Sequence, residues 1–284
     1  MRPSTLALIA AAALAVFSAH SASAQATGGR LKAITASKTI KIAHRTDAVP
    51  FSYVDRTNGV SGYTIDVCKA VVASLQRQFK LAALNVRWVP ATSQSRFDVV
   101  ASGKADIECG ASSVTLSRMK QVDFSNYVFV ESTGLVARPG ISNLKDLAGK
   151  KIAVIAGTSN EKAMAAKNPE IKATLVAVKD RDEAIAAMAS GQVDAFASDK
   201  LLLAGTQFKD IQSLQMLPDN LSVEPYAIVL PRGDWELRLA VNTALAELFK
   251  SGEITKIFDQ WFGKYDMKPG MLNSATFMLG AIPE

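Results

Sequence analysis

The sequence has few histidines and few cysteines, and this scarcity excludes several kinds of site. Among 284 residues there are only two histidines, His20 and His44, and two cysteines, Cys68 and Cys109. A zinc site needs a cluster of His, Cys or carboxylate ligands, and a serine-type triad needs a histidine as its base. We therefore expect no metal, no cofactor and no catalytic centre of the kinds that most hydrolases use.

Long apolar runs and dense basic blocks are also missing. Beyond the N-terminus, no segment approaches the roughly 20 apolar residues of a membrane-spanning helix. The 32 Lys and Arg against 26 Asp and Glu give a net charge of +6 without long Lys/Arg blocks, so nucleic acid is not an expected partner. The turn at 157–161 lacks the lysine and the spacing of a phosphate-binding loop, which disfavours ATP.

Residues 1–24 are predicted to be a cleavable secretory signal. Arg2 precedes a short apolar run at 6–17, and the small residues at 22–24 come before Gln25. This order is typical of a secretory signal rather than of a membrane span. No cysteine follows the cleavage site, so no lipid anchor is expected, and loss of Arg2 lowers the charge from +6 to +5. The mature chain should reside outside the cytoplasm, in the periplasm if the source is Gram-negative.

The two cysteines leave two alternatives open. Cys68 lies on an apolar stripe of helical spacing with Ile65, Val72 and Leu75, and Cys109 ends an apolar strand. In an oxidising compartment these residues form either a disulfide or two separately buried thiols.

Predicted strands alternate with predicted helices along most of the chain. The strands are expected at 39–43, 86–89, 105–109, 152–156, 174–178 and 193–197. The helices are expected at 64–79, 95–102, 184–190 and, in the C-terminal part, within 234–262. This alternation predicts an α/β fold with parallel sheets, in which ligands bind beyond the carboxyl ends of the strands.

Two segments repeat the same local pattern, which suggests two lobes of similar design. Lys41-Ile42-Ala43 is echoed by Lys151-Ile152-Ala153, and the helix–glycine–strand junction at 101–106 is echoed at 189–194. The apolar stretches 127–136 and 226–230 are natural crossings between such lobes. We therefore expect one lobe from 38–130 and 228–284, and a second from 131–227.

The stretch from Glu108 to Arg118 has the composition of half an amino-acid site. Gly110 allows a ligand to approach the backbone, Ser112 and Ser113 offer hydroxyl and N–H groups, and the Arg118 guanidinium matches a carboxylate. A turn of this composition is also common in ordinary loops, so its function depends on the rest of the chain.

Several ordered motifs resemble those of the periplasmic solute-binding proteins of polar amino-acid ABC importers, and in particular the glutamate/aspartate-binding branch. The motifs are His-Arg with Val-Pro-Phe-Ser-Tyr at 44–53, Gly-Tyr at 62–63, Thr-Ser-Gln-Ser-Arg at 92–96, Glu-Cys-Gly at 108–110 with Arg118, Gly-Thr at 157–158 and Gln-Trp-Phe at 260–262. The resemblance implies a type II periplasmic binding protein fold, whose two α/β lobes are joined by two hinge crossings and close on an amino acid. It also implies a monomer that delivers its ligand to a membrane permease.

The resemblance implies a role for eight residues. Arg118 would anchor the α-carboxylate with Ser113 and Thr158, and Asp199 would receive the α-ammonium with the Ala111 carbonyl. The side-chain carboxylate pocket would be formed by Arg45, Ser93 and Arg96.

The expected ligand is an acidic L-amino acid, glutamate or aspartate. A monocarboxylate zwitterion needs only one cation and one anion, and extra buried arginines would require a second negative group. Arg181 stands where acidic-ligand relatives often place a histidine, and Asp180 and Asp182 are alternative surface partners for it. The alternatives are glutamine, asparagine or a simple dicarboxylate as ligand, or a dehydratase-like enzyme with Glu108 as the nearest candidate general acid.

Overall fold

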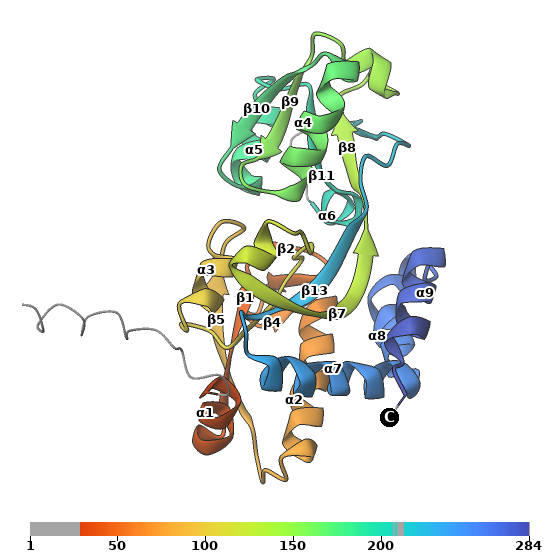
Figure 1. Ribbon diagram of the computed structural model, residues 1–284. Coiled ribbons are helices and arrows are strands. Elements are labelled where there is room, and N and C mark those ends of the chain that lie inside the picture. Colours follow the sequence, from red (N-terminus) through yellow and green to blue (C-terminus); the bar gives the residue numbers. More distant parts are fainter. Residues whose placement is uncertain (1–28, 207, 209–212, 284) are drawn as a thin grey trace, which may run out of the picture.

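The computed structural model describes residues 29–206, 208 and 213–283. The predicted signal at 1–24 lies outside the described residues. The described chain forms two lobes, each built on a five-stranded sheet (Figure 1). Their strand orders are β5-β1-β6-β13-β7 and β10-β9-β11-β8-β12.

The first sheet begins as the predicted parallel α/β unit. Its strands β1 (Thr39–Arg45), β5 (Asn85–Ala91) and β6 (Ile107–Cys109) run parallel and are connected by helices α2 (Tyr63–Gln78) and α3 (Arg96–Ala101). The apolar stripe of α2 faces this sheet because Ile65, Cys68 and Leu75 are buried.

The prediction of wholly parallel sheets is wrong for the strands next to the hinge. In the first sheet β13 (Glu224–Pro231) runs antiparallel to β6 and to β7 (Val122–Glu131). In the second sheet β8 (Thr133–Ala137) runs antiparallel to β11 (Ala195–Asp199) and to β12 (Gln215–Met216). The reason is topological, because the chain leaves one lobe along β7 and returns to it along β13.

The second lobe contains the other predicted βα units. Strands β9 (Lys151–Ile155) and β10 (Thr174–Val178) are parallel to each other and β9 is parallel to β11. The helices of this lobe are α4 (Ser159–Ile171), α5 (Arg181–Ala189) and α6 (Lys200–Gly205). Helix α6 lies on the side of this lobe that faces the first (Figure 1).

The remaining elements are short or terminal. They are α1 (Gly29–Ser37), the small sheet β2 (Asp47–Ala48), β3 (Ser52–Val54) and β4 (Val60–Ser61), and the 3₁₀ turns η1 (Arg118–Lys120), η2 (Leu144–Leu147) and η3 (Gly263–Tyr265). The predicted helical part at 234–262 is two helices, α7 (Trp235–Lys250) and α8 (Glu253–Phe262), because Gly252 between them has φ of +74°.

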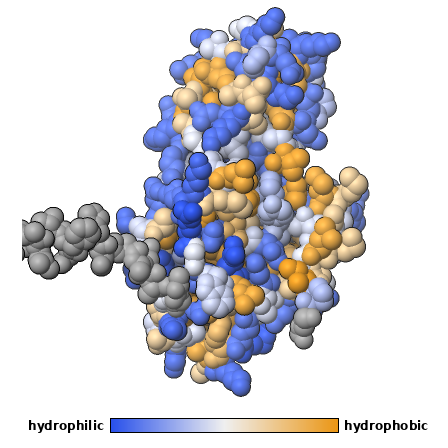
Figure 2. Space-filling model, in the orientation of Figure 1, coloured by the Kyte–Doolittle hydropathy of each residue, from blue (hydrophilic) through white to orange (hydrophobic). Residues whose placement is uncertain are grey.

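The final helix, α9 (Met271–Gly280), packs beside β7 (Figure 1). It leaves apolar side chains at the surface. Met271, Leu272, Met278 and Leu279 are exposed, and Figure 2 shows hydrophobic side chains gathered over this part of the molecule. Within the described ranges no helix combines the length and the apolar character that crossing a bilayer requires.

The repeated sequence pattern produces the same contact in both lobes. The Asp106 carboxylate accepts a hydrogen bond from the backbone N–H of Lys41 at 2.7 Å, and the Asp194 carboxylate accepts one from Lys151 at 2.8 Å. In each lobe an aspartate after the helix–glycine turn therefore binds the N-terminal half of the neighbouring strand.

A disulfide between Cys68 and Cys109 joins α2 to the end of β6, with a Cα–Cα distance of 6.4 Å. This bond decides between the two alternatives that the sequence left open. Since Cys109 directly precedes the turn at 110–113, the disulfide also holds the base of that turn against the core.

Candidate functional site

A polar pocket lies between the two lobes, beyond the carboxyl ends of parallel strands from both sheets. It encloses about 340 Å³ of space, part of it open to solvent. Its lining residues are Arg45, Ser93, Arg96, Ala111, Ser113, Ile155, Thr158, Ser159, Asn160, Arg181, Ser198, Asp199 and Leu202. Seven of the eight predicted ligand-binding residues are therefore brought together from five separate stretches of the chain.

The lobes contact each other around this pocket. The Ser159 hydroxyl donates to the Ser113 hydroxyl at 3.2 Å, and the Lys162 ammonium donates to the Ser117 hydroxyl at 3.3 Å. Gln94 donates to the backbone carbonyl of Lys179 on the opposite lobe. These contacts describe a clamp whose two sides have met.

Arg118 is the one predicted residue that does not line the pocket. Its Nη1 donates to the Ser113 carbonyl at 2.7 Å, and its guanidinium carbon lies 4.8 Å from the centre of the Phe97 ring. Arg118 therefore borders the pocket directly behind Ser113. Burial lowers its pKa, and the Glu224 and Asp199 carboxylates oppose that effect.

Arg96 is a buried cation without a protein acceptor. Arg96 is the first residue of α3 and is 3% exposed. Its side chain donates no hydrogen bond within the described part of the chain. Its guanidinium carbon lies 4.7 Å from the centre of the Phe97 ring. Burial, aided by the Arg118 and Arg45 charges, lowers the pKa of Arg96 to about 9, so the group remains cationic at neutral pH.

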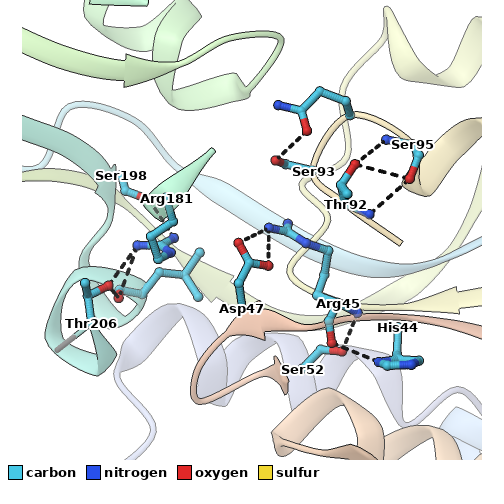
Figure 3. Close-up of polar contacts among 12 residues, drawn as sticks. His44, Arg45, Asp47, Ser52, Thr92, Ser93, Ser95, Arg181, Ser198 and Thr206 are labelled. Atoms are coloured by element: carbon cyan, nitrogen blue, oxygen red, sulfur yellow. Dashed lines mark hydrogen bonds and ion pairs between the residues drawn. The ribbon is translucent and has the colours of Figure 1, made fainter. Parts of the chain in front are cut away.

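Arg45 already has a partner, which corrects the expectation that it depends on a ligand for a counter-charge. It ends β1, and its Nη2 donates to both carboxylate oxygens of Asp47, at 2.6 and 2.8 Å (Figure 3). Asp47 lies only two positions after Arg45 in the chain and neutralises its charge. The number of pocket arginines that need a negative group from the ligand is therefore smaller by one than expected.

Arg181 points inward and is 5% exposed, so its surface pairing with Asp180 or Asp182 is wrong. Its guanidinium donates to the Thr206 hydroxyl at 2.9 Å and to the Ser198 hydroxyl at 3.3 Å (Figure 3). Asp180 instead caps α5, where its side chain accepts from the Glu183 N–H.

Asp199 provides the negative group of the pocket. It ends β11 and accepts a hydrogen bond from the Asn160 side chain at 3.1 Å. Burial, with the Glu224 carboxylate nearby, raises the pKa of Asp199 to about 6. An ammonium group placed against this carboxylate would stabilise its ionised form.

The other predicted residues differ in how freely they face the pocket. Thr158 caps α4, where its hydroxyl accepts from the Glu161 N–H at 3.2 Å, and the Ser93 hydroxyl contacts the Gln94 amide oxygen at 3.1 Å.

Glu108 is completely buried but does not line the pocket. Burial raises the pKa of Glu108, and the Arg96 charge opposes that shift.

Sequence reasoning missed several lining residues: Ile155, Ser159, Asn160, Ser198 and Leu202. Ser159 and Asn160 lie in the turn that was identified at 157–161, so their position next to Thr158 was an available signal. Ser198 precedes Asp199 in the same strand end. Leu202 has no such signal, since it reaches the pocket from α6.

The most informative comparisons are with bacterial amino-acid-binding proteins. Residues 40–264 match the model of the bacterial extracellular solute-binding proteins, family 3. The chain is 34% identical over 261 residues to the glutamate/aspartate import solute-binding protein of Salmonella typhimurium, covering 88% of this chain and 84% of the relative. It is 34% identical over 241 residues to the L-glutamate/L-aspartate-binding protein of Pseudomonas aeruginosa, covering 82% and 80%.

Solved structures agree with the fold. An ancestral arginine-binding protein bound to glutamine matches with a TM-score of 0.70 at 29% identity, covering 80% of this chain and 98% of that one. An ancestral amino acid-binding protein, described as a precursor of cyclohexadienyl dehydratase, matches with a TM-score of 0.70 at 27% identity, covering 82% and 99%. With two lobes around a polar pocket and a family match over most of its length, the chain belongs to the bacterial extracellular solute-binding proteins of family 3.

Proposed function

We propose that this protein captures an acidic L-amino acid outside the cytoplasm and delivers it to the membrane permease of an ABC importer, without catalysing a reaction. The observation that carries the proposal is that one pocket holds the buried carboxylate of Asp199 and the buried cation of Arg96, whose side chain donates to no acceptor among the described residues. The names of the Salmonella and Pseudomonas relatives support the same ligand class.

The proposed roles follow the three charges of such a ligand. Asp199, with the Ala111 carbonyl, receives the α-ammonium. Arg118, with Ser113 and Thr158, receives the α-carboxylate. Arg96, with Ser93 and Arg45, receives the side-chain carboxylate, because a charged group buried without a partner is costly unless a ligand supplies one.

The proposed lobe limits are 38–130 and 228–284 for the first lobe and 131–227 for the second. Support comes from strand β7, which ends at Glu131, and strand β8, which begins at Thr133, because the two strands belong to different sheets. A monomer exported by a cleaved signal at 1–24 completes the proposal, supported by the N-terminal pattern of the sequence.

Glutamine or asparagine is the second candidate ligand, and the ion pair between Arg45 and Asp47 favours it. That pair removes one positive charge from the end of the pocket that would meet the ligand side chain. A dehydratase-like activity has weaker support, since Asp199 is the one carboxylate among the lining residues and Glu108 lies outside them.

Calorimetry with glutamate, aspartate, glutamine and succinate tests the proposal. We expect the acidic amino acids to bind more tightly than glutamine, and succinate to bind poorly because it leaves Asp199 without its ammonium. Glutamine binding as tightly as glutamate would refute the acidic assignment. A turnover assay with prephenate-like acids should show no product.

Two variants separate the proposed roles. Arg118→Ala should abolish binding of every amino acid, whereas Arg96→Ala should weaken acidic ligands selectively, by about tenfold or more, since a charged hydrogen bond contributes about 1.5–3 kcal/mol. Arg87→Ala is the matched control, because Arg87 is exposed and outside the pocket. Equal losses of affinity for glutamate and glutamine in Arg96→Ala would contradict the assignment of Arg96 to the side-chain carboxylate.

A further inference from the structure

Asp47 contacts the pocket only through other residues. It lies in β2, two positions after Arg45, and its side chain is 28% exposed, whereas the side chain of Arg45 is 5% exposed. Arg45 lines the pocket and Asp47 does not. Any influence of Asp47 on a ligand must therefore act through its charge and through the arginine that it holds.

The geometry of the pair limits what Arg45 can offer to a ligand. A guanidinium binds a carboxylate most strongly through two nitrogens at once, either Nη1 with Nη2 or Nε with Nη2. Both arrangements include Nη2, and the two Asp47 oxygens lie 2.6 and 2.8 Å from that nitrogen. Nη2 carries two N–H groups, so a ligand carboxylate that uses this nitrogen must share it with Asp47, whereas Nε has no hydrogen-bond partner among the described residues.

The same carboxylate also acts on the opposite lobe. Figure 3 shows Asp47 between the side chains of Arg45 and Arg181. The Asp47 charge raises the pKa of Arg181 against the effect of burial, so the two groups are close enough to interact. One internal carboxylate thus offsets the positive charge of two pocket arginines, whereas the side chain of Arg96 donates no hydrogen bond to any residue that the structure describes.

We propose that the Asp47 carboxylate sets ligand specificity through its charge, by lowering the preference of the pocket for a carboxylate side chain over an amide side chain. The inference rests on the proposed function. A ligand carboxylate near Arg45 meets the like charge of Asp47 and a guanidinium that Asp47 already shares, which disfavours it. A ligand amide is neutral and does not experience that repulsion, so glutamine and asparagine remain competitive ligands.

Calorimetry on the full mature chain with the variant Asp47→Asn tests the inference. We expect glutamate to bind about three- to tenfold more tightly, a range reduced for the partial exposure of Asp47, while the affinity for glutamine changes less than about twofold. The gain for glutamate should shrink between about 0.05 M and about 0.5 M salt, because salt screens the repulsion.

Asp182→Asn is the matched control. Asp182 follows Arg181, is exposed, and makes no ion pair among the described residues. Its replacement removes the same charge from the second lobe, next to Arg181 in the chain, so the ratio of glutamate to glutamine affinity should stay at the wild-type value. A change in that ratio equal to that of Asp47→Asn would overturn the inference, since general charge would then explain it.

Other outcomes also overturn the inference. An unchanged or lower ratio in Asp47→Asn shows that Asp47 orients Arg45 for the ligand or only supports the fold. Thermal unfolding checks that the variant is folded, and Asp47→Ser provides a second removal of the carboxylate with the same expected rise in the ratio. A wild-type protein that binds neither glutamate nor glutamine would instead overturn the proposed function itself.

Discussion

At the scale of single residues, burial raises the pKa of Asp199 above that of a free aspartate side chain. Its pKa is raised to about 6 by burial and by Glu224, so the carboxylate changes charge within a range where the ligand does not. The pKa of Asp199 is higher in the folded than in the unfolded chain. Protonation of Asp199 therefore adds to the free energy of unfolding of the ligand-free protein below pH about 4, and this contribution is lost as the pH rises through about 6.

Glutamate affinity should therefore depend on pH. Protonation of Asp199 removes the partner of the α-ammonium, so we expect the Kd to rise as the pH falls below about 6, approaching tenfold per pH unit well below that pKa. Calorimetry from pH 8 to pH 5 measures this change, and binding at pH about 5.5 should release protons.

A second, half-buried carboxylate supplies the control for this pH dependence. Burial raises the pKa of Glu131 to about 7, and this side chain accepts from the Leu201 N–H at 2.6 Å rather than lining the pocket. If Asp199 causes the pH dependence, the Glu131→Gln variant should still lose glutamate affinity as the pH falls below about 6. A Kd that is flat across the range in the wild type would contradict the role of Asp199.

At the scale of elements, one covalent bond supports the turn that carries half of the site. The Cys68–Cys109 disulfide links α2 to β6 across a sequence separation of 41 residues. Strand β6 is only three residues long, and the pocket residues Ala111 and Ser113 follow it directly. A short strand offers few hydrogen bonds, so the crosslink anchors the start of the turn.

Removal of this disulfide should lower the free energy of unfolding. The chain-entropy model for a loop of this length gives a loss of about 4 kcal/mol for the double variant Cys68→Ser with Cys109→Ser. Urea unfolding monitored by circular dichroism measures the change, with the wild type under non-reducing conditions as reference. A loss below about 1 kcal/mol would show that packing around α2 holds β6 without the bond.

At the scale of the whole molecule, one glycine permits the lobes to meet. A Cβ added at Gly205, at the end of α6, would lie 2.9 Å from the carbonyl carbon of Val49 and closer still to its oxygen. Gly205 belongs to the helix that follows β11, whereas Val49 follows β2 in the other lobe. The closed arrangement therefore requires the absence of a side chain at this point.

Gly205→Ala should weaken every ligand by a similar factor, because it opposes closure rather than any single contact. We expect a loss of about tenfold, as for a steric contact of 1–3 kcal/mol, and a larger radius of gyration of the ligand-loaded protein in solution scattering. Gly263→Ala is the control, since its nearest contact would be an ordinary 3.7 Å. Selective loss of acidic ligands alone would contradict this role.

The α/β design with two lobes was readable from the sequence because its signals are local. The echo between Lys41 and Lys151 marks two equivalent strands, and the aspartates at 106 and 194 make equivalent contacts with them. The direction of β13 was not readable, since strand pairing depends on how the chain returns through the hinge.

The sequence by itself determined which residue types stand at the ends of the strands, and these ends place Arg45, Arg96 and Asp199 in one pocket. Only the tertiary structure decided how their charges are used. In the tertiary structure Arg181 is buried, Arg45 pairs with Asp47, and Arg96 donates to no acceptor within the described ranges. The physical reason is that the sequence sets which element carries each charged side chain. What that side chain can bind depends on its burial and on its distance to other charges, and both depend on packing.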